Sequence, residues 1–132
     1  MSINDYEEAI LLWEKTEGMG LGESDSYDCI KSFLERNEKL SYVYIEGEKM
    51  IGAVLCGHDG RRGFLYHLAV DKMNRNRGVG SRLVETCLKN LKMQGIHKCH
   101  IFVMGTNETG KQFWDKSEWE YRNDLLIYSR KL

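Results

Sequence analysis

The order of elements around Gly78 restricts the fold of this chain more than any other feature of its sequence. A β-rich run at 64–70 is followed by a helical pattern at 78–94 and then by an apolar, strand-like run at 98–104. The helix carries an apolar stripe and ends at Gly95, which is a typical C-terminal cap. Two strands joined through one helix form a right-handed crossover, so we expect these strands to be parallel neighbours.

Three further helices are predicted from capping residues and helical spacing. The first covers about 5–17, where Asp5 and Glu8 resemble a capping box. The second begins after Ser26, a favourable N-cap residue. A short helix at 109–116 follows the crossover.

The remaining strands are predicted to be antiparallel. β-rich runs at 40–46 and 50–58 precede the run at 64–70, and short turns join the three into a meander. One or two terminal strands are expected within 120–130. We therefore predict an α+β fold with a central mixed, mostly antiparallel twisted sheet and helices on both faces, in one domain spanning 1–132.

Composition excludes several classes of protein. The chain has 132 residues, of which 42% are hydrophobic and 30% charged, as is ordinary for a globular domain. No apolar run approaches the roughly 20 residues that cross a bilayer, and the acidic N-terminus does not resemble a signal peptide. We expect a soluble cytoplasmic protein that does not contact membranes.

Metal and nucleic-acid binding are also not indicated. The four cysteines are far apart and form no Cys-x-x-Cys pair, so neither a disulfide framework nor a metal site is predicted. A net charge of −1 gives no general attraction to nucleic acid, and the basic residues cluster at one helix start instead of along an aromatic strip.

The loop that enters the helix at 78–94 has the composition of a phosphate-binding site. Gly78 and Gly80 let backbone N–H groups approach a ligand closely, and the helix start adds unpaired N–H groups and a positive dipole end. Arg75, Arg77 and Arg82 supply positive charge. The loop is neither a Walker loop nor a dinucleotide fingerprint, because it lacks the Gly-Lys-Ser/Thr of the former and the third glycine or alanine of the latter.

The run Arg75–Gly80 resembles the Arg/Gln-x-x-Gly-x-Gly/Ala signature of GNAT acetyltransferases. The resemblance extends to Leu65–Val70 before it, and to Ile101–Val103, Asn107 and Phe113–Lys116 after it. It implies a GNAT fold and an N-acetyltransferase that moves the acetyl group of acetyl-CoA directly to a primary amine, without a metal. A non-catalytic, acyl-CoA-binding regulatory module is the alternative.

The resemblance also implies where acetyl-CoA binds. The pyrophosphate is expected on the backbone amides of the signature loop, and the pantetheine arm beside the strand at 64–70. A backbone N–H near Leu68 is expected to hold the thioester oxygen as its charge develops. The expected cofactor-binding residues are Leu68, Val70, Arg75, Arg77, Gly78, Val79, Gly80, Ser81, Asn107 and Trp114.

The resemblance further implies that the base that deprotonates the amine lies on the strand at 64–70 and acts directly or through water. By simple alternation the even-numbered positions share one face, which favours Tyr66, and His67 then faces the other way unless a bulge redirects it. His58 and Glu23 are further candidates without positional support. We predict Tyr66.

Trp114 departs from the family, which commonly has a tyrosine there to protonate the departing thiolate. An indole cannot serve as an acid near neutral pH. Either the thiolate takes its proton from water, or Tyr121 or Tyr128 reaches in from the terminal strands; the non-catalytic alternative is the third interpretation.

The acceptor pocket is expected near 18–26, the connection between the first two helices. Glu23 and Asp25 make this segment acidic, which favours a small-molecule amine or a peptide amine as acceptor. The sequence leaves monomer and homodimer equally open.

Overall fold

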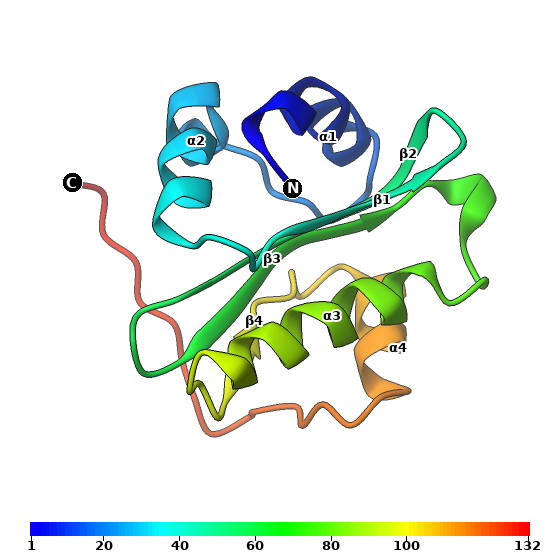
Figure 1. The fold of residues 1–132 in the computed structure, drawn as a ribbon. Helices are drawn as coiled ribbons and strands as arrows, with labels where there is room; N and C mark the ends of the chain where they lie inside the picture. Colours follow the sequence, from blue (N-terminus) through cyan, green and yellow to red (C-terminus); the bar gives the residue numbers. More distant parts are fainter.

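The computed structural model describes all 132 residues (Figure 1). Three single 3₁₀ turns, at Ile3–Asp5, Glu23–Asp25 and Lys72–Asn74, accompany the regular elements. These are α1 (Tyr6–Glu14), α2 (Tyr27–Arg36), β1 (Tyr42–Glu46), β2 (Lys49–His58), β3 (Gly63–Val70), α3 (Val79–Met93), β4 (Cys99–Ile101) and α4 (Glu108–Asp115).

The four strands form one mixed sheet in the order β1-β2-β3-β4. β1 pairs with β2 and β2 with β3 antiparallel, whereas β3 and β4 are parallel across the α3 crossover. Figure 1 shows α1 and α2 over one face of the sheet and α3 and α4 over the other. The predicted α+β architecture, with a mostly antiparallel sheet between helices, is confirmed.

Each face of the sheet has its own apolar core. On the α3 side, Cys56 and Leu65 pack with the apolar stripe of α3, including Leu83 and Leu91. On the α1 and α2 side, a second cluster packs around the fully buried Trp13. Burying both faces positions β3 firmly, because its residues contribute to both cores.

The helix starts agree with the sequence in part. Ser26 caps α2 as predicted, its Oγ accepting a hydrogen bond from the Cys29 N–H at 3.4 Å. The capping box predicted for Asp5 and Glu8 is wrong. Asp5 instead accepts from the Ser2 N–H at 2.7 Å, because a 3₁₀ turn precedes α1.

A β-bulge interrupts β3 at His67. The pairing with β2 shifts between Ala53 and Leu55, and His67 has a φ of +53° in the left-handed region. Tyr66 therefore packs with the α1 and α2 core, whereas Leu68 packs with the α3 core. The predicted common face for the even-numbered positions of β3 is wrong, because the bulge reverses the alternation at this point.

β3 and β4 separate after three residue pairs, the last of which is Leu65 with Ile101. The strand expected at 98–104 is therefore confined to Cys99–Ile101. Beyond this point, Tyr66–Val70 has no strand partner on the β4 side. This leaves an opening between β3 and the segment that follows β4.

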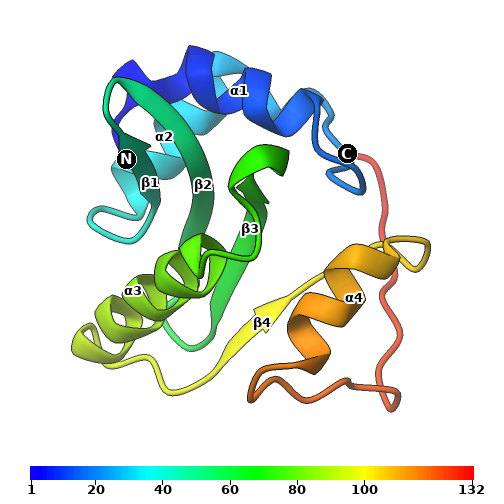
Figure 2. The same cartoon turned by 90° about the vertical axis from the view of Figure 1, so that its right-hand side faces the viewer.

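The terminal strands expected within 120–130 are wrong. The segment after α4 contains no strand, and its apolar side chains at 125–128 are exposed. In Figure 2 this tail runs past α4 on the side away from β4, and its end approaches the α1–α2 connection. Strand-forming residues give no strand without a partner to pair with, and none lies beside the tail.

Candidate active site

A cavity of about 810 Å³ occupies the opening between β3 and the chain after β4. Its walls are the second half of β3, the start of α3 with its preceding loop, the segment 101–107, α4 and the α1–α2 connection at 16–20. None of the helices is both long and apolar enough to cross a membrane. No three His, Cys, Asp or Glu side chains group in a way that could hold a metal ion.

The start of α3 presents backbone N–H groups to this cavity. Gly78 is the N-cap, with a φ of +79°, and α3 begins at Val79. Arg82 donates the first helical hydrogen bond, to the Gly78 carbonyl at 3.0 Å, so the N–H groups of the three residues between them have no helical partner. All three of these residues, Val79, Gly80 and Ser81, line the cavity together with Gly78.

Gly80 allows a close approach of its neighbours in α4 and β3. A Cβ there would lie 3.2 Å from Phe113 Cε2 and 3.5 Å from Val70 Cγ2. The absent side chain therefore lets α4 pack directly against the start of α3, and this contact forms one end of the cavity.

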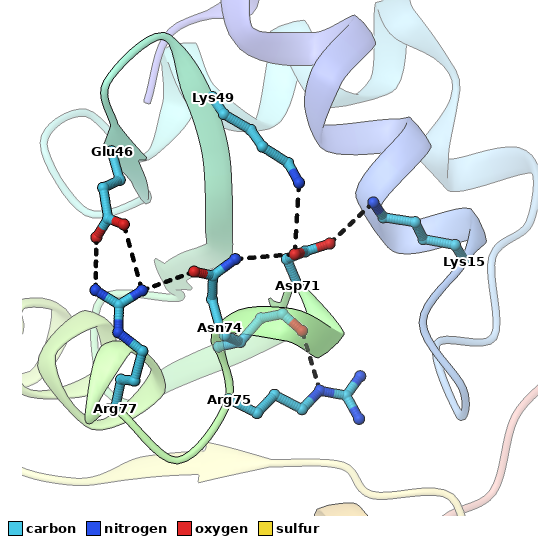
Figure 3. Close-up of polar contacts among 8 residues, drawn as sticks. Lys15, Glu46, Lys49, Asp71, Asn74, Arg75 and Arg77 are labelled. Atoms are coloured by element: carbon cyan, nitrogen blue, oxygen red, sulfur yellow. Dashed lines mark hydrogen bonds and ion pairs between the residues drawn. The ribbon is translucent and has the colours of Figure 1, made fainter.

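The three arginines of the loop and of the first turns of α3 point in different directions. Arg77 points toward the β1–β2 hairpin, where it binds Glu46 through contacts of 2.8 and 3.3 Å and Asn74 at 2.7 Å (Figure 3). Arg82 donates to the Tyr44 hydroxyl at 3.3 Å. Neither side chain lines the cavity, although the backbone around Arg77 adjoins it.

Arg75 is the signature arginine that lines the cavity. Its Nε donates to the Val70 carbonyl at 3.1 Å, and its guanidinium pairs with Glu17 at 2.8 Å. The hydrogen bond from Arg75 lowers the pKa of Glu17 below its usual range. One cation thus connects the loop, the end of β3 and the α1–α2 connection.

Asp71 fixes the loop to the rest of the fold. Its buried carboxylate accepts from Lys15 Nζ of α1 at 3.1 Å and from Asn74 Nδ2 at 2.9 Å, and Lys49 Nζ of β2 lies 3.6 Å away (Figure 3). The Lys15 ammonium is the chief cause that holds the pKa of Asp71 below its usual range. The loop that carries the signature is therefore attached to both α1 and β2.

Asn107 and Trp114 lie at the α4 end of the cavity. Asn107 caps α4, accepting from the Gly110 N–H at 2.9 Å, and Gly18 of the α1–α2 connection packs directly against its side chain. Trp114 is buried and makes edge-to-face contacts with Phe113 and Trp119, each with ring centroids 4.8 Å apart. Both predicted residues line the cavity, and Trp114 is also part of the α3-side core.

The fold places only some of the predicted proton-transfer residues at the cavity. Tyr66 lines the cavity, edge-on to Phe33, and burial raises the pKa of its hydroxyl above the usual range. Tyr121 and Tyr128 are 83% and 89% exposed and do not line the cavity. His58 lies outside it as well, with Gln94 3.0 Å from its Nε2.

His67 is the residue that strict alternation assigned to the wrong face. The bulge brings it into the cavity lining, where its Nε2 lies 2.6 Å from Asp25 Oδ1. The only sequence signal is weak: histidine is among the non-glycine residues that more often accept a left-handed backbone.

The end of the cavity beside the α1–α2 connection, where the acceptor was expected, is apolar rather than acidic. Glu23 points outward, 4.0 Å from Lys131, and Asp25 is buried against His67; neither lines the cavity. The apolar side chains at this end come from the α1–α2 connection, the segment after β4 and the tail: Met19, Phe102, Met104 and Ile127.

The family follows from comparison with known proteins. The model of the acetyltransferase (GNAT) family matches residues 7–118, and the chain therefore belongs to this family of acetyl-transferring proteins. An acetyltransferase of Sodalis glossinidius is 29% identical over 129 residues, covering 98% of this chain and 90% of the relative. An acetyltransferase of Photorhabdus laumondii is 28% identical, with the same coverage of both chains.

Solved structures show the same fold at low sequence identity. An aminoglycoside acetyltransferase from a soil metagenomic sample, in complex with sisomicin, superposes with a TM-score of 0.77 at 16% identity, over 100% of this chain and 93% of that one. The PaiA N-acetyltransferase of Thermoplasma acidophilum, in complex with coenzyme A, gives 0.73 at 20% identity, over 88% and 84%.

Proposed function

We propose that this protein is an acetyl-CoA-dependent N-acetyltransferase. The observation that carries the proposal is that one cavity brings together two stretches of backbone whose polar groups lack hydrogen-bond partners. The free N–H groups at the start of α3 adjoin the stretch of β3, from Tyr66 to Val70, that lacks a strand partner on the β4 side. The first surface suits a pyrophosphate, and the second suits the amide groups of a pantetheine arm.

The donor binds along these two surfaces. The pyrophosphate takes N–H groups from Gly78, Val79, Gly80 and Ser81, with Arg77 contributing its backbone and Arg75 its charge. The pantetheine arm follows Leu68 and Val70, and Asn107 and Trp114 border its path. Because Arg75 holds the Val70 carbonyl, the arm either uses the remaining lone pair of that oxygen or displaces the guanidinium.

The reaction is direct attack of an amine on the thioester carbonyl. The Leu68 N–H donates to the carbonyl oxygen as negative charge develops there. The amine must first lose a proton, since a primary ammonium has a pKa of about 10.4. Trp114 supplies no proton, so the thiolate takes one from water or from the attacking nitrogen.

The acceptor we propose is a primary amine attached to a compact apolar body. The solved relative bound to sisomicin acts on an aminoglycoside, as its name states. In this chain, however, the one carboxylate that lines the cavity is Glu17, and Arg75 already neutralises it. A polycation would find no free carboxylate there, whereas Met19, Phe102 and Met104 offer apolar contact.

Thiol release from acetyl-CoA across an amine panel tests this function. Aromatic and branched aliphatic monoamines should support release with a lower KM than spermidine or an aminoglycoside. Calorimetry with CoA, run in parallel, separates the non-catalytic alternative. Tight binding without release from any amine would favour the regulatory module and contradict an enzyme.

A further inference from the structure

We propose that His67 is the general base of this acetyl transfer and that Asp25 is its positioning residue. The inference rests on the proposed function and names the group that takes the proton from the acceptor ammonium. It replaces Tyr66 in that role. The observation behind it is the contact of 2.6 Å between His67 Nε2 and Asp25 Oδ1 at the wall of the cavity.

The backbone directs His67 into this position at some cost. A non-glycine residue rarely adopts a φ of +53°, and such a conformation persists only where surrounding contacts hold it. The imidazole packs on Trp13, with ring centroids 5.2 Å apart. Its side chain is 15% exposed. The bulge also places His67 directly before Leu68, whose N–H is the proposed donor to the thioester oxygen.

Asp25 determines which ring nitrogen carries the proton. Its Oδ2 accepts from the Gly22 N–H at 2.8 Å, and its backbone carbonyl accepts from the Tyr6 hydroxyl at 2.8 Å. The carboxylate is thereby held with Oδ1 toward His67. An ionised carboxylate only accepts hydrogen bonds, so Nε2 is the protonated nitrogen of the neutral ring and Nδ1 carries the lone pair.

Nδ1 of His67 has no hydrogen-bond partner in the protein. It is also not among the buried side-chain nitrogens and oxygens that lack a partner, of which Trp13 Nε1 is the sole member, so it is not sealed in the core. Because His67 lines the cavity, we assign this nitrogen to the bound amine, directly or through one water.

The other charged groups near the cavity are unsuited to the role. Glu17 is neutralised by Arg75, and Lys116 is a cation. Tyr66, beside His67 on β3, has a pKa raised by burial, so even less of it is the phenolate that could accept a proton near neutral pH. The groups packed around His67 itself are Trp13 from α1 and Asp25 from the turn before α2.

The proton balance is complete without another reactant. His67 Nδ1 takes one proton from the ammonium, and the freed nitrogen lone pair forms the new C–N bond. The C–S bond then breaks, its electron pair leaves on the thiolate, and a second proton from the attacking nitrogen neutralises that sulfur. The products are the amide, the CoA thiol and one proton, which His67 releases to solvent.

The first test is the protonation pattern of the ring, which needs no acceptor. Nitrogen-15 NMR of histidine-labelled protein, assigned with His67→Asn, should show the Nε2–H form in the neutral protein. In Asp25→Asn the Gly22 N–H still requires the amide oxygen, so the amide NH₂ faces His67 and the ring should switch to Nδ1–H. An Nδ1–H ring in the wild type would overturn the proposal.

The second test is turnover with the best amine of the panel. His67→Asn keeps a residue that tolerates the left-handed backbone, and it should lower kcat about 10²- to 10⁴-fold. Asp25→Asn should lower kcat at least tenfold and should switch the ring tautomer seen by NMR. The KM for acetyl-CoA should stay within twofold in both, and His58→Asn, outside the cavity, should match the wild type.

The outcomes distinguish a failure of this inference from a failure of the proposed function on which it rests. Wild-type protein that binds acetyl-CoA but acetylates no amine would overturn the enzyme and the base together. Turnover that survives His67→Asn within threefold would overturn the base alone. An Asp25→Asn variant that unfolds more easily yet keeps the wild-type kcat and ring tautomer would show that Asp25 is only structural.

Discussion

Arg77 and Glu46 bind each other through two hydrogen bonds, of 2.8 and 3.3 Å, and the arginine of the signature loop is thereby turned away from the cavity. The pair joins the loop to the β1–β2 hairpin, and Arg77 lowers the pKa of Glu46. A basic residue of the signature loop can thus hold that loop in place instead of facing the cavity.

Arg75 and Arg77 should differ in their effect on CoA binding. Arg75→Ala removes the one arginine side chain of the signature loop that lines the cavity and should weaken CoA binding by three- to tenfold in calorimetry. Arg77→Ala should leave the dissociation constant within twofold, because its side chain already binds Glu46. Equal losses for the two variants would show that Arg77 reorients toward the ligand.

Ser81→Glu should abolish CoA binding without damaging the fold. Ser81 is exposed, lines the cavity and lies in the first turn of α3, where a carboxylate favours the helix dipole. The same carboxylate would repel a pyrophosphate. Thermal melting should show unchanged or slightly higher stability, and Ser81→Gln should retain affinity. Gly80→Glu is a poorer test because of the nearby Phe113 ring. Full affinity in Ser81→Glu would mean that the pyrophosphate lies elsewhere.

Asp71→Asn should lower stability in a pH-dependent way. The pKa of Asp71 is lowered in the folded state, chiefly by Lys15, so its contribution is present above the unfolded pKa of about 3.9 and is lost as pH falls through the lower folded value. Urea denaturation at pH 7 should show a loss on the order of 1–2 kcal/mol in unfolding free energy. The gap between variant and wild type should shrink below about pH 4. A gap that does not change with pH would show that the charge is irrelevant.

Trp114→Tyr should cost stability and gain no catalysis. The smaller ring leaves space between Phe113 and Trp119 and places a hydroxyl in an apolar cluster, at a cost of about 1–3 kcal/mol in unfolding free energy. Turnover should not rise, because Trp114 belongs to the core as well as to the cavity wall. A tenfold rise in kcat would instead show that the wild type lacks an acid.

Regular patterns in the sequence predicted most of the fold. The crossover from β3 through α3 to β4 was predictable because the helical stripe and Gly95 delimit the helix, and Gly95 does adopt the expected left-handed conformation. The meander was predictable from its short turns. The start of the helix at Gly78 was likewise predictable, whereas the close approach of Phe113 to Gly80 was not, because the sequence pattern assigned that glycine to a bound ligand.

The side of β3 on which His67 lies could not be predicted, because it depends on one unpaired residue. A bulge at His67 results from the register of β3 against β2, and no local residue pattern encodes it. The pairing of His67 with Asp25 joins positions 42 residues apart. The terminal strands failed for a related reason, since strand propensity does not report whether a partner strand is present.

Transfer of a labelled acetyl group tests the central claim most directly. The wild type and Ser81→Glu are incubated with an aromatic monoamine and acetyl-CoA carrying carbon-13 in its acetyl group, and the amine is analysed by mass spectrometry. We expect labelled amide from the wild type and only the uncatalysed background from the variant. Label that stays on CoA or appears only as acetate, while the wild type binds CoA, would contradict an N-acetyltransferase.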